Sequence, residues 1–156
     1  MTSRRLRFAC ALALLIGAGA LNEGRAQQIS VVGGNLVMSV TTGTASAQPV
    51  AVTSTTSSLR WRRQNVISKI TVAASCPAQR FSLAVLATNL THGVAAPQVS
   101  LFNGMLATDL VLSIPTGNPL NKTCTLRYTA SATYAQGNST ELGNDVYSIT
   151  YTLVAQ

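Results

Sequence analysis

The side chains that could carry out catalysis are few and scattered along this chain of 156 residues. It has one histidine, His92, in a Thr-His-Gly context typical of a turn. After residue 26 the only acidic residues are Asp109, Glu141 and Asp145. A Ser–His–Asp hydrolase could be drawn from His92 and Asp109, but no serine has a spacing that selects it as the nucleophile. Neither a Gly-x-Ser-x-Gly elbow nor a phosphate-binding loop ending in lysine occurs, so we expect a non-enzymatic protein, with a hydrolase as the minor alternative.

Metal ligands are equally sparse. A zinc site needs three or four nitrogen or sulfur ligands, and one histidine with a pair of cysteines does not supply them. Calcium needs clustered oxygen ligands, which Asn138, Glu141, Asn144 and Asp145 offer only thinly. We therefore expect no metal and no cofactor.

A short basic cluster, Arg60-Trp61-Arg62, is the best candidate for ligand contact. Arginines beside an aromatic ring can bind anionic polysaccharide or lipid headgroups through charge and stacking. The alternative, which we favour, buries Trp61 in the core and leaves Arg60 and Arg62 on the solvent face. The chain lacks the interleaved aromatic residues of single-strand binders, so we expect no nucleic-acid partner. The ligand of such a site would be a surface glycan or a lipid.

Residues 1–26 have the organisation of a secretory signal peptide. Arg4, Arg5 and Arg7 precede an apolar run over 8–21, and 24–26 provide a small-x-small cleavage site. The run is shorter than the ~20 residues that a membrane-spanning helix needs, and no later run is longer. Cleavage removes four arginines and one glutamate, which leaves seven basic and three acidic residues. We expect export to the periplasm, the outer surface or the medium, and no transmembrane segment after cleavage.

Two cysteines remain after cleavage, Cys76 and Cys124. An even pair in an exported domain is most simply a disulfide. Both cysteines fall on the apolar positions of alternating segments, which predicts a bond inside the domain.

Short alternating segments separated by turn residues run through the remainder of the chain. Such a pattern, without a convincing amphipathic helix, predicts a single antiparallel β-sandwich. We expect an N-terminal strand and linker over 27–48, and the sandwich domain over 49–156. The tail is expected to be a hairpin, with two alternating strands around the Gly- and Asn-rich turn 136–145. The expected strands lie within 27–42, 49–55, 59–62, 66–76, 81–89, 99–102, 106–114, 124–134 and 147–153.

The last fourteen residues resemble the C-terminal segment of bacterial pilin subunits assembled by the chaperone–usher route. Counting Gln156 as the last position, Gly143 is the fourteenth from the end, where that family has a glycine. Ile149, Tyr151 and Leu153 occupy the alternating apolar positions. The sequence departs from the family at the penultimate position, where Ala155 replaces a tyrosine, and in its central and late cysteines.

The resemblance implies an immunoglobulin-like or pilin-like sandwich that lacks one strand, which the N-terminal extension of a neighbouring subunit supplies by strand addition. A glycine in such a donor strand permits close approach. The alternative, which we favour from the residues alone, is that the segment 27–42 pairs within its own subunit as an edge strand. The residues of this chain that match a donor strand are Ile29, Val31, Gly33, Leu36, Met38 and Val40.

Two functional hypotheses follow. The first is an exported structural or adhesive cell-surface protein, a fibre subunit that associates with itself or with a partner subunit by strand addition. The second is a stand-alone exported module that binds carbohydrate or lipid through Arg60, Trp61 and Arg62.

Overall fold

The computed structural model describes residues 28–41, 47–62, 65–117, 121–136 and 142–156. The regular structure in this part of the chain consists mainly of strands, with a short 3-10 turn at Tyr134–Gln136. The expected signal peptide and its cleavage site lie outside the described residues. Nine strands are present among the described residues: β1 (Gln28–Val32), β2 (Val52–Arg62), β3 (Ser68–Ser75), β4 (Ser82–Thr88), β5 (Val94–Ala95), β6 (Val99–Leu101), β7 (Thr108–Ile114), β8 (Lys122–Ser131) and β9 (Ser148–Ala155).

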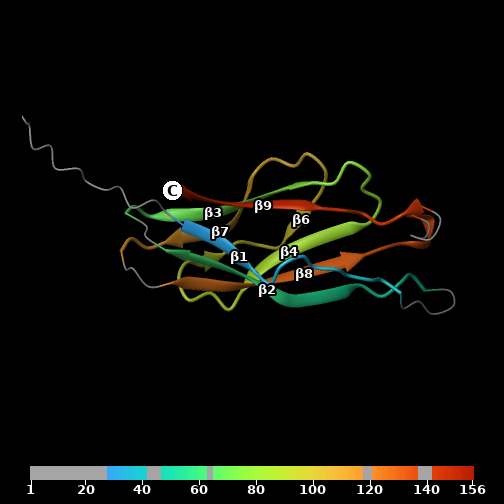
Figure 1. Cartoon of the computed structure of the whole chain (residues 1–156), viewed down its shortest axis with the longest axis horizontal. Helices are drawn as coiled ribbons and strands as arrows, with labels where there is room; N and C mark the ends of the chain where they lie inside the picture. Colours follow the sequence, from blue (N-terminus) through green and yellow to red (C-terminus); the bar gives the residue numbers. More distant parts are fainter. Residues whose placement is uncertain (1–27, 42–46, 63–64, 118–120, 137–141) are drawn as a thin grey trace, which may run out of the picture.

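The strands form two sheets (Figure 1). One has five strands in the order β1-β2-β8-β4-β6, and the other has four in the order β5-β7-β3-β9. Every pairing between neighbours is antiparallel. The prediction of an all-β, antiparallel sandwich is therefore confirmed.

The core follows from the alternation of side chains along each strand. In β8, Cys124, Leu126 and Tyr128 are buried, whereas Thr125 and Arg127 between them face outward. Burial of these apolar side chains between the two sheets is the main favourable term in folding. Within the described residues, no helix has the length and apolar character needed to cross a membrane. The largest fully buried apolar side chains are Trp61, Leu59, Ile70, Leu101, Leu110, Ile114, Leu126, Val72, Val85 and Val111.

The expected hairpin at the tail is wrong. β8 lies inside the five-stranded sheet, where β2 and β4 occupy both of its edges. β9 pairs with β3 in the other sheet. The chain between them crosses from one sheet to the other, because neither edge of β8 is left for β9.

The segments expected at 49–55 and 59–62 are one strand. β2 carries an extra residue between Ser54 and Ser57, which pair with Tyr128 and Leu126 of β8. A bulge of this kind inserts one residue without ending the strand. It shifts the inward-facing positions from one parity to the other along β2.

The predicted disulfide is also wrong, since Cys76 and Cys124 are free buried thiols. The position of Cys124 along the sandwich follows from its neighbour Lys122, two residues earlier on β8. Lys122 Nζ donates to the carbonyl of Pro115 at 2.7 Å, and Pro115 directly follows the last residue of β7. That end of β7 pairs with Ser68, at the start of β3. Cys76 follows the other end of β3, a strand of eight residues, or about 26 Å at 3.3 Å per residue. A disulfide requires Cα atoms within about 7 Å of each other, so side-chain parity alone misled the prediction.

The loop before β9 is fixed by the carboxylate of Asp145, one of the few potential calcium ligands in the sequence. Asp145 accepts hydrogen bonds from the backbone N–H groups of Arg80 at 2.9 Å and Phe81 at 2.8 Å. The Tyr147 hydroxyl donates to the Phe81 carbonyl at 2.9 Å. Through these hydrogen bonds Asp145 anchors the entry to β9. No group of three or more potential metal ligands occurs in the described part of the chain.

Candidate functional site

The first candidate site is the open side of the sandwich, where the edge strands of the two sheets approach each other. β1 is the edge strand of the five-stranded sheet and also contacts β9, the edge strand of the other sheet. β1 pairs with β2 of its own chain, with Ile29 opposite Trp61 and Val31 opposite Leu59. Val31 has inward-facing parity and is still 49% exposed, so this side of the sandwich is only partly covered.

The ladder between β1 and β2 ends at a pair of glycines. Gly33 has φ 121° and Gly34 has φ 66°, values that residues with a side chain rarely adopt. A Cβ atom on Gly33 would lie 2.8 Å from the carbonyl oxygen of Thr56, beside the bulge of β2. The close approach that the sequence suggested for Gly33 is therefore made to β2 of the same chain.

Beyond the glycines, residues 35–41 continue the alternation without joining a sheet. Leu36, Met38 and Val40 are half-buried, and Leu36 and Met38 pack against the core. Val37 between them is 87% exposed. These residues form no strand ladder with any described strand. We call residues 28–41 the N-terminal segment; Figure 1 shows it in blue to cyan, continuing from β1 along the sandwich.

β9 forms the other border of the open side. Ile149, Tyr151 and Leu153 pack against the core, and β9 is hydrogen-bonded to β3 alone among the described strands. The hydroxyls of Tyr151 and Tyr128 lie 2.6 Å apart and link the two sheets. Burial, together with the adjacent Tyr128, raises the pKa of Tyr151. Gly143 lies in the loop before β9 with φ 80°, and a Cβ atom added to it would meet no described atom within 4 Å.

Two strand edges, those of β1 and β9, border the open side. An edge strand presents backbone N–H and C=O groups that another strand can pair with. Here β1 and β9 both have such an edge, and Leu36 and Met38 of the N-terminal segment pack against the core. The geometry suits β-strand addition, in which the backbone gives affinity and alternate side chains give specificity.

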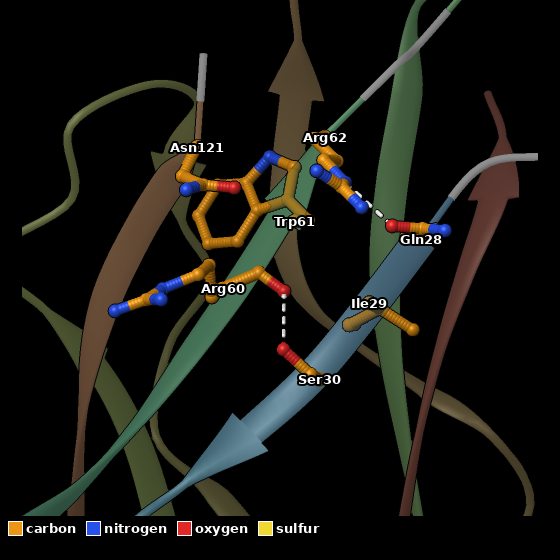
Figure 2. A pocket seen from close by; sticks show the side chains of 7 residues that line it. All are labelled: Gln28, Ile29, Ser30, Arg60, Trp61, Arg62 and Asn121. Atoms are coloured by element: carbon orange, nitrogen blue, oxygen red, sulfur yellow. Dashed lines mark hydrogen bonds between the residues drawn. The ribbon is translucent and has the colours of Figure 1, made fainter. Parts of the chain in front are cut away.

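The second candidate site is the basic cluster on β2 (Figure 2). Arg60, Trp61 and Arg62, together with residues of β1 and Asn121, line a depression of about 620 Å³. Trp61 points inward and is 1% exposed, whereas Arg60 and Arg62 lie on the outer face of the sheet. Arg62 Nε donates to Gln28 Oε1 across the β1–β2 pair. A ligand on this face can therefore reach the two arginines, whereas Trp61 lines the depression with only 1% of its surface exposed.

Three features near this cluster were not singled out from the sequence. Lys122, the register partner of Trp61, is 2% exposed, and burial lowers the pKa of its amine. The Trp61 Nε1 atom is buried and has no hydrogen-bond partner among the described residues. Arg127 lies on the outer face of β8, the same face as Arg60 and Arg62. In the sequence, Arg127 alternates with threonines and a serine over 125–133, and that signal could have linked it to the basic cluster.

His92 and Asp109, the two residues considered for a hydrolase, share no hydrogen-bond network in the described part of the chain. The Asp109 carboxylate binds Lys69 Nζ at 2.9 Å across the four-stranded sheet. His92 is exposed in the connection after β4.

A search of protein-family models, of curated proteins and of solved structures found no match to this chain. Function is therefore inferred from the open side and the basic face described above.

Proposed function

We propose that this chain is an exported structural subunit of a cell surface, which assembles by β-strand addition through its N-terminal segment. One observation carries the proposal. Leu36 and Met38 pack against the core and Val40 is half-buried, but the backbone of residues 35–41 forms no ladder with a described strand. A segment held in this way can be replaced by the same segment of another copy.

We expect the free energy of such an exchange to be close to zero. Full burial of an aliphatic side chain stabilises by roughly 1.5–3 kcal/mol, and the half-buried Leu36, Met38 and Val40 contribute a part of that each. The same contacts form again when the segment enters a neighbour, so little is lost in the exchange. A new backbone ladder along the free edge of β9 would favour the intermolecular arrangement.

We further propose that the sandwich is immunoglobulin-like or pilin-like. This assignment is supported by the placement of Ile149, Tyr151 and Leu153, the residues behind the pilin resemblance, in the edge strand of the open side. Export rests on the composition of residues 1–26. The N-terminal segment, which begins at Gln28, starts shortly after that point.

A second candidate function is supported by the outward direction of Arg60 and Arg62. In that case the protein is a stand-alone exported module that binds carbohydrate or lipid. The two functions differ in what residues 28–41 do, because a stand-alone module keeps this segment within its own sheet.

The experiment that tests strand addition uses a protein that begins at Pro49, refolded with and without a synthetic peptide of residues 28–41. We expect the peptide to bind and to raise the melting temperature of the truncated protein. A peptide with Met38→Asp should bind at least about tenfold more weakly, because it places a charge against the core.

The matched control is a peptide with Val37→Asp, since Val37 is 87% exposed and lies one residue from Met38. It should bind within about twofold of the natural peptide. Failure of the natural peptide to bind, or equal weakening by both substitutions, would contradict the proposal.

A further inference from the structure

The outer face of the five-stranded sheet carries arginines among hydroxyl side chains. Register places Arg60 opposite Thr123 and Ser58 opposite Thr125, while β4 adds Thr88 beside Thr125. All of these positions have outward parity, the opposite of Leu59, Cys124 and Leu126. We call this surface the arginine–hydroxyl face; the residues on which it depends are Arg60, Arg62, Arg127, Ser58, Thr125 and Thr129.

The charge on this face has one sign. The two described carboxylates lie elsewhere: Asp109 is on β7 and pairs with Lys69, and Asp145 binds the backbone at Arg80 and Phe81. Among the described residues, no acidic side chain therefore neutralises Arg60, Arg62 or Arg127. An uncompensated set of like charges attracts a partner of the opposite charge.

The charges are spread along the strands. Arg127 lies four residues along β8 from Thr123, the partner of Arg60, which corresponds to about 13 Å at 3.3 Å per residue. Arg62 lies two residues from Arg60 on the same face, or about 7 Å. Figure 2 shows Arg62 directed toward Gln28 on β1, with Arg60 extending away from it on the side of β8. An extended ligand with repeated negative groups fits this spacing better than a compact anion does.

We propose that the arginine–hydroxyl face binds an anionic polysaccharide. Arginine binds carboxylate or sulfate groups through paired hydrogen bonds. The serine and threonine hydroxyls between the arginines can donate to and accept from sugar hydroxyls. Single-stranded nucleic acid is disfavoured because Trp61, the aromatic residue of the cluster, points into the core and offers no stacking surface.

This inference is independent of strand addition. The arginine–hydroxyl face is the outer surface of one sheet, whereas strand addition uses the edges of β1 and β9. Failure of one proposal leaves the other standing.

The test measures binding of the folded protein to immobilised polygalacturonate and heparin, with neutral dextran as reference. We expect binding to both polyanions, weaker at higher salt because exposed charges are screened. The double variant Arg60→Gln with Arg127→Gln should bind about 10- to 100-fold more weakly, since each arginine makes charged hydrogen bonds. Both side chains are exposed, so this variant should keep its fold.

The control is the double variant Lys69→Gln with Arg80→Gln, which removes the same charge from other surfaces and should bind within about threefold of the unmodified protein. Circular dichroism checks the fold of each variant, and Lys69→Gln compared with Arg127→Gln replaces the pair if the double control unfolds. The inference is overturned if R60Q/R127Q keeps full binding or if the control loses as much. Anionic lipid vesicles and oligothymidylate are tested in the same way. The inference is also overturned if dextran binds equally, or if the protein binds the vesicles or oligothymidylate but neither polysaccharide.

Discussion

At the scale of single residues, burial favours the neutral form of the two cysteine thiols in the interior. Cys124 is 1% exposed, and burial raises the pKa of its thiol to about 11. Burial also raises the pKa of Cys76, with a further contribution from the charge of Asp145. A thiolate is the nucleophile in thiol–disulfide exchange, so a raised pKa lowers the reactivity of both thiols at neutral pH.

The buried thiol of Cys124 makes stability depend on pH. Its pKa in the folded protein is above the ordinary value of 9.0, so the neutral form is favoured by folding. The associated stabilisation is complete below pH 9 and is lost as the pH rises toward 11. We expect the unmodified protein to lose about 1 kcal/mol more than Cys124→Ala between pH 8 and pH 10.

Urea unfolding of both proteins at the two pH values, with a reductant present, measures this difference. The cavity that Cys124→Ala leaves has the same cost at both pH values and cancels. An identical pH dependence in the two proteins would show that Cys124 does not titrate as a buried thiol.

At the scale of strands, alternation in the sequence locates the elements but not their partners. The apolar parity over 124–130 and 66–76 predicted the inward faces of β8 and β3. Parity does not specify which strand lies beside which, because the pairing of β3 with β9 joins residues far apart in sequence. Parity also does not specify where along the length of the sandwich a residue lies. The disulfide prediction failed for that reason, because Cys76 and Cys124 lie toward opposite ends of β3.

One missed feature had a signal in the sequence. The apolar positions change from even numbers, at Val50 and Val52, to odd numbers, at Leu59 and Trp61. A change of parity within one strand is what a bulge produces. For the candidate site, the inward direction of Leu36 and Met38 was predictable in the same way, but their contact with the core of their own chain was not.

The glycine pair at the end of β1 gives a prediction at this scale. Gly33→Ala places a Cβ against the Thr56 carbonyl, 2.8 Å away, at φ 121°. We expect it to lower the free energy of unfolding by about 2 kcal/mol or more, since it combines a steric clash with backbone strain.

Gly34→Ala is the matched control, because Gly34 has φ 66° and no atom within 4 Å of the added carbon position. It should cost only about 1 kcal/mol. Urea unfolding of both variants measures the difference. Equal costs would show that β1 does not approach β2 as described.

At the scale of the whole molecule, the two candidate interaction surfaces lie on different parts of the sandwich. The open side lies along the edges of the two sheets, and the arginine–hydroxyl face is the outer surface of one of them. A chain that assembles through the edges would leave this face outward along a fibre. Repetition of a weak glycan site along such a fibre would raise its avidity without any new contact.

The most direct measurement of strand addition asks whether an intact subunit donates its segment to another. Protein comprising residues 27–156 is unfolded and refolded together with protein that begins at Pro49, and the masses are measured by size-exclusion chromatography with light scattering. We expect a one-to-one complex of the two proteins, which is lost when the longer protein carries Met38→Asp and retained with Val37→Asp. If the two proteins elute as separate monomers at all concentrations, the N-terminal segment serves only its own chain and the proposed assembly is wrong.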